Sequence, residues 1–296
     1  MNTNLLEYRH VDVFTPRPYG GNSLTVFPNT HGLTSAQMLA VTLEMRHFES
    51  IFLEPTGDPR IVKAQVFDLI EELDFAGHPI IGAAGVLHEG MGGSNAETWS
   101  FVLKHKTVTV ITKRTANGYN ALLNQGRPEF LGKLPRDRHA EFAAALNLDL
   151  ADVSVKYVPE VISTGLRYLV FPIESGLDCA RILHRDFEAL LETVNAQFVY
   201  VLDVNALEGS HWNNDGVIED IATGSGAGTV GAYLVKHGRV AANVEFILHQ
   251  GRFTGRPSQI RVCGEGSAND LVNMRVGGDV VLVGRGVLET LPEATS

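Results

Sequence analysis

The sequence predicts an α+β protein of two similar domains, each with strands gathered around one central helix. Most segments are short stretches of alternating apolar and polar residues, which indicates strands. Two helical segments, within residues 75–93 and 222–240, share a glycine-led start, a body of Gly, Ala and branched residues, and a closing Gly. A helix with small residues on all sides packs closely against its neighbours, so we expect both to be buried.

The first half of the chain is expected to alternate strands with two helices. A helix is predicted over residues 34–48, because Thr34 and Gln37 form a capping box and apolar residues follow at helical spacing. Asn117-Gly118 between two alternating stretches predicts a hairpin. The buried helix covers residues 77–90. The strands expected here cover residues 7–14, 23–27, 60–70, 98–103 and 107–112.

The second half repeats this plan with one more helix. Helices are expected at residues 136–146, 186–194 and 225–237, and strands at 120–130, 165–173, 197–204, 243–250, 258–263 and 272–286. At roughly 100–200 residues per domain, a chain of 296 residues has room for two domains. We place them at residues 1–118 and 119–283, and expect a last strand near 284–296 that can pack back on the first domain.

Composition excludes several classes of function. The 24 basic and 34 acidic residues give a net charge of −10, so the chain repels nucleic-acid phosphate and anionic membranes. Two cysteines, Cys179 and Cys263, make neither a disulfide framework nor a zinc site and are typical of a reducing compartment. No signal peptide and no apolar run long enough to span a membrane are visible. We therefore expect a cytoplasmic protein that binds no nucleic acid and no membrane.

One motif suggests a nucleotide site, and we reject it. Gly226, Gly228 and Gly231 match G-x-G-x-x-G, and Glu245 lies near the spacing of a ribose-binding acid. That site needs a continuous apolar strand directly before the glycines, whereas "GVIEDIAT" stands there with two acids. No Gly-Lys-Ser/Thr of a P-loop follows, and Ser225 lacks the G-x-S-x-G spacing of a nucleophile. Metal binding is equally unsupported, because there is no i, i+4 histidine pair and no Cys/His cluster.

Three ionisable residues are candidates for catalysis. Glu49 stands among apolar residues in "RHFESIFLEP", which should raise its proton affinity as a general acid/base requires; the alternative is an exposed strand carboxylate. His78 begins the first buried helix and could pass a proton or bond a substrate carbonyl; the alternative is a histidine satisfied by backbone. Asp220 could orient a substrate group, or be an ordinary turn residue.

The starts of the two buried helices are candidates for binding an anion. Free N–H groups and the positive end of the dipole favour a carboxylate there. Gly77 and Gly224 would allow its atoms to come close. Ser225 and Thr223 could add hydroxyl donors, although Ser225 could equally be a plain helix cap and Thr223 a turn residue. We therefore expect a small carboxylate substrate.

Together these residues resemble the PhzF family of phenazine-biosynthesis-like isomerases, which share the diaminopimelate epimerase fold. The resemblance runs in order over nearly the whole chain and is carried by "GGNSLTVF", "FESIFLEP", "ELDFAGHPIIGAA", "STGLRYLVFPI", "EDIATGSGAG" and "GRFTGRPSQI". It implies two pseudo-symmetric domains, each a curled, mainly antiparallel sheet around its helix, with the active site in the cleft. It also implies a homodimer, no cofactor and a proton-shifting isomerase, with the family's glutamate, histidine, aspartate and serine at Glu49, His78, Asp220 and Ser225.

Departures from the family pattern leave the substrate open. The family usually has proline where this chain has Ser23 and Ile221, and often at Asp74. The racemases and epimerases of this fold use a cysteine at each central helix start, where this chain has Ala76-Gly77-His78 and Thr223, so a two-thiol mechanism is excluded. Two hypotheses remain: an isomerase, shifting a proton or epimerising a centre, and a catalytically silent member that binds small molecules or proteins.

Overall fold

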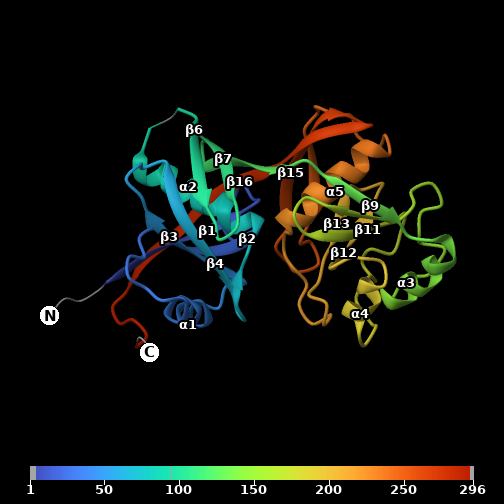
Figure 1. Cartoon of the computed structure of the whole chain (residues 1–296), viewed down its shortest axis with the longest axis horizontal. Helices are drawn as coiled ribbons and strands as arrows, with labels where there is room; N and C mark the ends of the chain where they lie inside the picture. Colours follow the sequence, from blue (N-terminus) through green and yellow to red (C-terminus); the bar gives the residue numbers. More distant parts are fainter. Residues whose placement is uncertain (1–4, 94, 294–296) are drawn as a thin grey trace. The chain divides into compact units, whose positions relative to one another are not determined.

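Two helices of small residues lie at the centres of two strand-rich units (Figure 1). The computed structural model of the chain describes residues 5–93 and 95–293. The first unit contains the described residues up to Asn124 and from Gly277 onward, and the second is Gln125–Val276. The chain passes between them inside strands β8 (Tyr119–Gly126) and β16 (Asp270–Leu288). The domain limits predicted after residues 118 and 283 lie a few residues from these points and stay a prediction.

The first unit is a sheet that closes on itself around α2 (Gly77–Met91). Its strands follow the order β1-β2-β3-β4-β6-β7-β8-β16, and β16 pairs antiparallel with β1. Only β2–β3 and β4–β6 are parallel among the pairings described here. Besides β8 and β16, the strands of this unit are β1 (Leu6–Val13), β2 (Asn22–Phe27), β3 (Glu49–Pro55), β4 (Ile61–Asp68), β5 (Glu72–Leu73, paired with β4), β6 (Glu97–Val102) and β7 (Thr107–Arg114).

The second unit wraps a similar sheet around α5 (Gly224–Lys236). Its strand order is β15-β14-β13-β12-β11-β10-β9, with β11–β12 and β13–β14 parallel and the other described pairings antiparallel. These strands are β9 (Glu129–Lys133), β10 (Glu160–Ser163), β11 (Arg167–Ile173), β12 (Phe198–Asp203), β13 (Glu208–Ser210), β14 (Phe246–Gln250) and β15 (Ser258–Ser267).

The small residues of the central helices allow strands to pack against them. A Cβ atom on Gly82 of α2 would lie 2.5 Å from a methyl carbon of Leu24, and one on Gly231 of α5 would lie 2.4 Å from Val262. Both distances are shorter than a van der Waals contact. The small-residue composition therefore positions each helix close to its sheet, and the predicted burial of both helices is confirmed.

The remaining helices cover the outer faces of the two sheets. In the first unit α1 (Ser35–Met45) packs on a cluster that includes Phe27, Phe52 and Phe67. In the second unit a 3₁₀ turn (Arg136–Arg138), α3 (His139–Ala145) and α4 (Phe187–Glu192) border a larger apolar cluster. Burial of such clusters contributes roughly 25 cal/mol per Å² of apolar area.

Several predicted elements are confirmed and some are corrected. The capping box of α1 is present, but the helix ends at Met45 because Arg46 takes a left-handed conformation with φ of 59°. The strand predicted over residues 120–130 is two strands, separated at Gly126, whose φ is +87°, and at Pro128, which has no N–H to donate. Strands β3, β5, β10 and β13 were not among the predicted strands.

Candidate functional site

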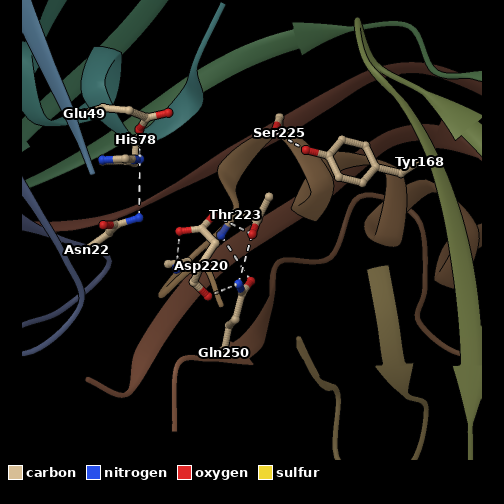
Figure 2. Close-up of polar contacts among 9 residues, drawn as sticks. Asn22, Glu49, His78, Tyr168, Asp220, Thr223, Ser225 and Gln250 are labelled. Atoms are coloured by element: carbon tan, nitrogen blue, oxygen red, sulfur yellow. Dashed lines mark hydrogen bonds and ion pairs between the residues drawn. The ribbon is translucent and has the colours of Figure 1, made fainter. Parts of the chain in front are cut away.

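The first unit brings Glu49, His78 and Asn22 together at the start of α2 (Figure 2). Glu49 is the first residue of β3, Asn22 the first of β2 and His78 the second of α2. Glu49 Oε2 lies 2.9 Å from His78 Nδ1, and Asn22 Nδ2 lies 3.4 Å from the same ring nitrogen. All three side chains are buried, with relative exposures of 7%, 4% and 1%. The predicted alternative for Glu49, an exposed strand carboxylate, is wrong.

The contacts of His78 leave one ring nitrogen for another partner. Its Nδ1 faces Glu49 and Asn22, whereas its buried Nε2 has no hydrogen-bond partner among residues 5–93 and 95–293. Glu49 Oε2 lies within ion-pair distance of Nδ1 and has no hydrogen-bond partner within the described chain. A buried polar atom without a partner costs free energy. A carboxyl group and an imidazole are therefore held side by side, and each keeps one buried atom without a hydrogen-bond partner in the described chain.

The first turn of α2 offers few donors of its own. Ala76, the N-cap residue, has no side-chain capping bond, and Gly77 and His78 follow it. Pro79 stands third and has no N–H. The first four N–H groups of a helix lack intrahelical acceptors, and here proline removes one of them. The turn is therefore a weaker anion site than a helix start without proline.

The second unit brings Asp220, Thr223 and Ser225 to the start of α5 (Figure 2). The Thr223 hydroxyl donates to Asp220 Oδ2 at 2.7 Å, and the N–H of Ala222 donates to Oδ1 at 3.3 Å. Asp220 is 8% exposed and Thr223 is 5% exposed. Asp220 is thus a buried carboxylate held by donors of its own turn.

Ser225 is not the cap of α5. The helix begins at Gly224, so Thr223 is the N-cap residue, and it makes no side-chain capping bond. The Ser225 hydroxyl lies 2.7 Å from the hydroxyl of Tyr168, which is 2% exposed. Ala227 N–H donates to Thr223 O, and helical geometry leaves the N–H groups of residues 224–226 without intrahelical acceptors. This first turn, with no proline, can hold an anion.

Burial controls protonation around Asp220. It lowers the pKa of His211, against the raising effects of the Asp220 charge and the hydrogen bond to Val199 O, so this imidazole is neutral near pH 7. Burial raises the pKa of Glu219, and the Asp220 charge acts in the same direction. Burial also raises the pKa of Tyr200 well above its ordinary value, so its hydroxyl stays protonated. The His211 imidazole and the Tyr200 hydroxyl beside Asp220 are therefore both neutral near pH 7.

The predicted site residues thus fall into two groups. Glu49, His78 and Gly77 lie together in the first unit, and Asp220, Thr223, Gly224 and Ser225 lie together in the second. Sequence reasoning missed Asn22, Tyr168 and Gln250, which contact these groups. Asn22 and Tyr168 lie within the motifs "GGNSLTVF" and "STGLRYLVFPI", which were the available signals, whereas Gln250 lies just outside "GRFTGRPSQI" and had none.

Other kinds of site find little support. Within residues 5–93 and 95–293, no group of three or more His, Cys, Asp or Glu residues could hold a metal ion. Cys179 is exposed and Cys263 is buried on β15, away from both helix starts in the sequence. In the same described range no helix is both long enough and apolar enough to cross a membrane.

The architecture is that of the epimerase-like α+β class of enzymes. A predicted epimerase from Pseudomonas aeruginosa matches with a TM-score of 0.90 and 44% identity, over 96% of this chain and 99% of that one. A probable proline racemase from Agrobacterium radiobacter K84 matches with a TM-score of 0.62 and 12% identity, over 95% of this chain and 92% of that one, which shows the fold alone. The predicted fold class is confirmed.

The family follows from the sequence comparisons. The model of the phenazine biosynthesis-like proteins, PhzC-PhzF, matches residues 11–286. The trans-2,3-dihydro-3-hydroxyanthranilate isomerase of Pseudomonas fluorescens is 30% identical over 295 residues, covering 95% of this chain and 98% of that protein. The chain belongs to the PhzC-PhzF family. The resemblance stated from the motifs is confirmed, and so is the prediction of an isomerase.

Proposed function

We propose that the protein is a cofactor-independent isomerase that shifts a proton next to a carboxylate or carbonyl group of a small metabolite. The observation that carries the proposal is the buried pair of Glu49 and His78, whose atoms lie 2.9 Å apart while His78 Nε2 keeps a free position within the described chain. A positioned acid/base of this kind contributes roughly 10²–10⁴-fold to a rate.

In the proposed reaction Glu49 is the base. Its carboxylate takes a proton from a carbon beside the carbonyl or carboxylate group, and the C–H electron pair moves into that group as an enolate. His78 donates a hydrogen bond to the developing negative charge. Glu49 then returns the proton to another carbon after the double bond has moved, or a second acid delivers a proton to the opposite face of the first carbon. The former outcome is an isomerisation and the latter an epimerisation.

The start of α5 is proposed to hold the substrate carboxylate. The N–H groups of residues 224–226 and the positive helix end favour an anion, and the Ser225 hydroxyl adds a donor. Asp220 accepts a hydrogen bond from a hydroxyl or amino group of the same molecule. Thr223 donates its hydroxyl proton to Asp220, so its place among the substrate-binding residues, like that of Gly77, stays a prediction.

The hydroxyanthranilate named for the Pseudomonas fluorescens relative is a suitable first probe, because it is a small carboxylate with a hydroxyl group. The wild-type protein would be incubated in D₂O with trans-2,3-dihydro-3-hydroxyanthranilate, and deuterium in the recovered compound would be located by mass spectrometry and NMR. We expect incorporation by the wild type and a loss of about 10²–10⁴-fold in rate with Glu49→Gln.

The experiment also separates the competing hypotheses. Deuterium on a new carbon indicates isomerisation, and deuterium with inversion at the original carbon indicates epimerisation. Calorimetry shows whether the probe binds at all. Binding without any exchange by the wild type would favour the silent binding member and reject the enzyme, as would equal exchange rates for the wild type and Glu49→Gln.

We also propose that the protein acts as a homodimer, on the support of the family resemblance alone. Light scattering on the purified protein distinguishes the 32.2 kDa chain from a particle of twice that mass. A monomer that exchanges the proton at full rate would reject this part of the proposal and leave the chemistry intact.

A further inference from the structure

Gln250, at the end of β14, makes four hydrogen bonds around the start of α5. Figure 2 shows Gln250 beside two of its partners, Asp220 and Thr223. Its oxygen accepts from the Thr223 N–H at 3.1 Å and from the Tyr200 hydroxyl at 2.9 Å. Its amide nitrogen donates to the Asp220 carbonyl oxygen and to the Thr223 hydroxyl oxygen, both at 2.9 Å. The residue is 1% exposed, and four bonds use nearly the whole capacity of a glutamine side chain.

The chemistry of the partners fixes which way the Gln250 amide points. A backbone N–H can only donate, so the Thr223 N–H must face the Gln250 oxygen. A backbone carbonyl can only accept, so the Asp220 oxygen must face the Gln250 nitrogen. The opposite orientation would place the Gln250 NH₂ group against the Thr223 N–H, donor against donor. It would also place the Gln250 oxygen against the Asp220 carbonyl oxygen, acceptor against acceptor. Inside the protein, a polar group without a hydrogen-bond partner costs about 1–3 kcal/mol.

The orientation of Gln250 in turn sets the direction of the next hydrogen bond. The Thr223 hydroxyl accepts a hydrogen bond from the Gln250 nitrogen, so its own proton points away from Gln250. That proton makes a hydrogen bond to Asp220 Oδ2, which lies 2.7 Å from the hydroxyl oxygen. Asp220 therefore accepts from Thr223. One amide at the end of β14 defines both the shape of the 220–223 turn and the direction of the bond to its carboxylate.

The loop after Gln250 supports the same turn. A Cβ atom on Gly251 would lie 2.5 Å from the backbone oxygens of Ile221 and Arg256, and the φ of Gly251 is +81°, so only glycine fits there without strain. The Ser258 hydroxyl contacts Ile221 O at 3.4 Å and Arg256 O at 3.2 Å. The segment from Gln250 to Ser258 is thus built against residues 220–223.

We propose that Gln250 is a positioning residue of the enzyme, acting through Thr223 on Asp220 and on the N–H groups that begin α5. This inference rests on the proposed function. Because a displacement of about 1 Å in a supporting group can cost about 10²-fold in rate, we expect Gln250→Met to lower kcat/KM by about 10–100-fold while the protein stays folded.

A matched variant separates positioning from stability. Gln37 is also buried, at 9% exposure, and bonds Pro292 O and Thr34 in the capping box of α1. Gln37→Met should lower the melting temperature by a similar amount and leave kcat/KM within about twofold. Tyr200→Phe removes one bond to Gln250 and should lower kcat/KM by about 2–10-fold. The Tyr200→Phe variant tests the same inference if Gln250→Met fails to fold.

Coupling between two variants tests the route of action. Thr223→Val keeps the shape of Thr223 and removes the hydroxyl that both Gln250 and Asp220 contact. If Gln250 acts through this hydroxyl, Thr223→Val should cost less in the Gln250→Met background than in the wild type. Fully additive losses in kcat/KM, or a Gln250→Met variant within twofold of wild type, would overturn the inference.

Amide hydrogen exchange keeps this inference distinct from the proposed function. In the free protein, peptides covering residues 220–226 should exchange at least tenfold faster in Gln250→Met than in wild type or Gln37→Met. An unchanged exchange rate overturns the inference whether or not the protein is active. Faster exchange in a wild type that transfers no deuterium to the probe would leave Gln250 as the residue that fixes the turn and reject only the proposed function.

Discussion

The central helices α2 and α5 share a small-residue body but have different first turns. The α2 turn carries His78 beside Glu49 and has Pro79 in its third position, so it has a buried imidazole–carboxyl pair and one N–H fewer. The α5 turn has Gly224, Ser225 and Gly226 in the same three positions. Each of these keeps its N–H, and none of them titrates near pH 7. The same fold has therefore been given different chemistry at its two helix starts.

This difference suggests a division of labour between the units. A group that moves a proton must be able to lose and regain it at working pH, which imidazole and carboxyl groups can do. A group that holds a carboxylate needs fixed donors in the correct direction, which backbone N–H groups supply without titrating. Under the proposed function, the α2 start would carry the proton chemistry and the α5 start would bind the carboxylate.

The largest expected effect contrasts His78 with Asp220. His78→Asn should lower kcat by about 10²–10³-fold with little change in KM, because the imidazole that donates to the developing negative charge is lost. Asp220→Asn keeps an oxygen that can accept from Thr223, and should mainly raise KM, by about 10–100-fold, because a hydrogen bond to a charged group is worth about 1.5–3 kcal/mol. Steady-state kinetics on the substrate found by deuterium exchange measures both. Equal losses of kcat in the two variants would break the division of labour.

A smaller effect is expected at Ser225. Ser225→Ala removes one hydroxyl donor and should raise KM by about 2–10-fold, equivalent to about 0.5–1.5 kcal/mol. Tyr168→Phe is the matched control, because it removes the partner hydroxyl at 2.7 Å and keeps Ser225. If Ser225 serves only Tyr168, the two variants will lose similar stability and neither will change KM.

The sequence predicted the parts of the fold that depend on local chemistry. The α1 cap needs only Thr34 and Gln37, three residues apart, and the central helices are recognised by small residues alone. Strand β10 depends on distant partners. It contains Glu160, which is 3% exposed and bonds Lys236 and His237 at the end of α5. Burial would raise the pKa of Glu160, but the hydrogen bonds and charges of those two residues outweigh it and lower the pKa.

The same distinction applies to the candidate site. Glu49, His78, Asp220 and Ser225 were found through motifs, in which residue type and neighbours are visible in the sequence. Gln250 lies 27 residues from Thr223, and its importance depends on the pairing that brings the end of β14 beside the α5 turn. An isolated glutamine before a glycine carries no signal of that contact. Supporting residues are therefore the part of a site that only the structure reveals.

The smallest expected effect compares a buried histidine in each unit. His88 on α2 lies 2.8 Å from the Thr112 hydroxyl, and His211 bonds Val199 O at 2.8 Å. Burial lowers the pKa of His88, opposed by Glu97 and assisted by Arg114. Burial likewise lowers the pKa of His211, opposed by Asp220 and Val199. Both side chains are therefore neutral in the folded protein at pH 7.

The sign of the pH effect follows from this lowering. Below about pH 6.5 the unfolded chain binds a proton at each histidine, whereas the folded protein binds it only below its lowered pKa. Stability should therefore be complete above about pH 6.5 and fall as the pH decreases toward the folded-state pKa, by about 1.4 kcal/mol for each unit of lowering. Thermal melts between pH 5 and pH 7 measure this slope.

Replacing each histidine tests the effect in its own unit. His88→Gln and His211→Gln should each make the fall in melting temperature shallower, because glutamine binds no proton in this range. His31→Gln, at an exposed position, should leave the slope as in the wild type. A slope that all three variants leave unchanged would mean that neither buried imidazole has a lowered pKa. A change with His88→Gln alone would mean that Asp220 compensates the burial of His211, and the surroundings of these two histidines would then differ in electrostatics.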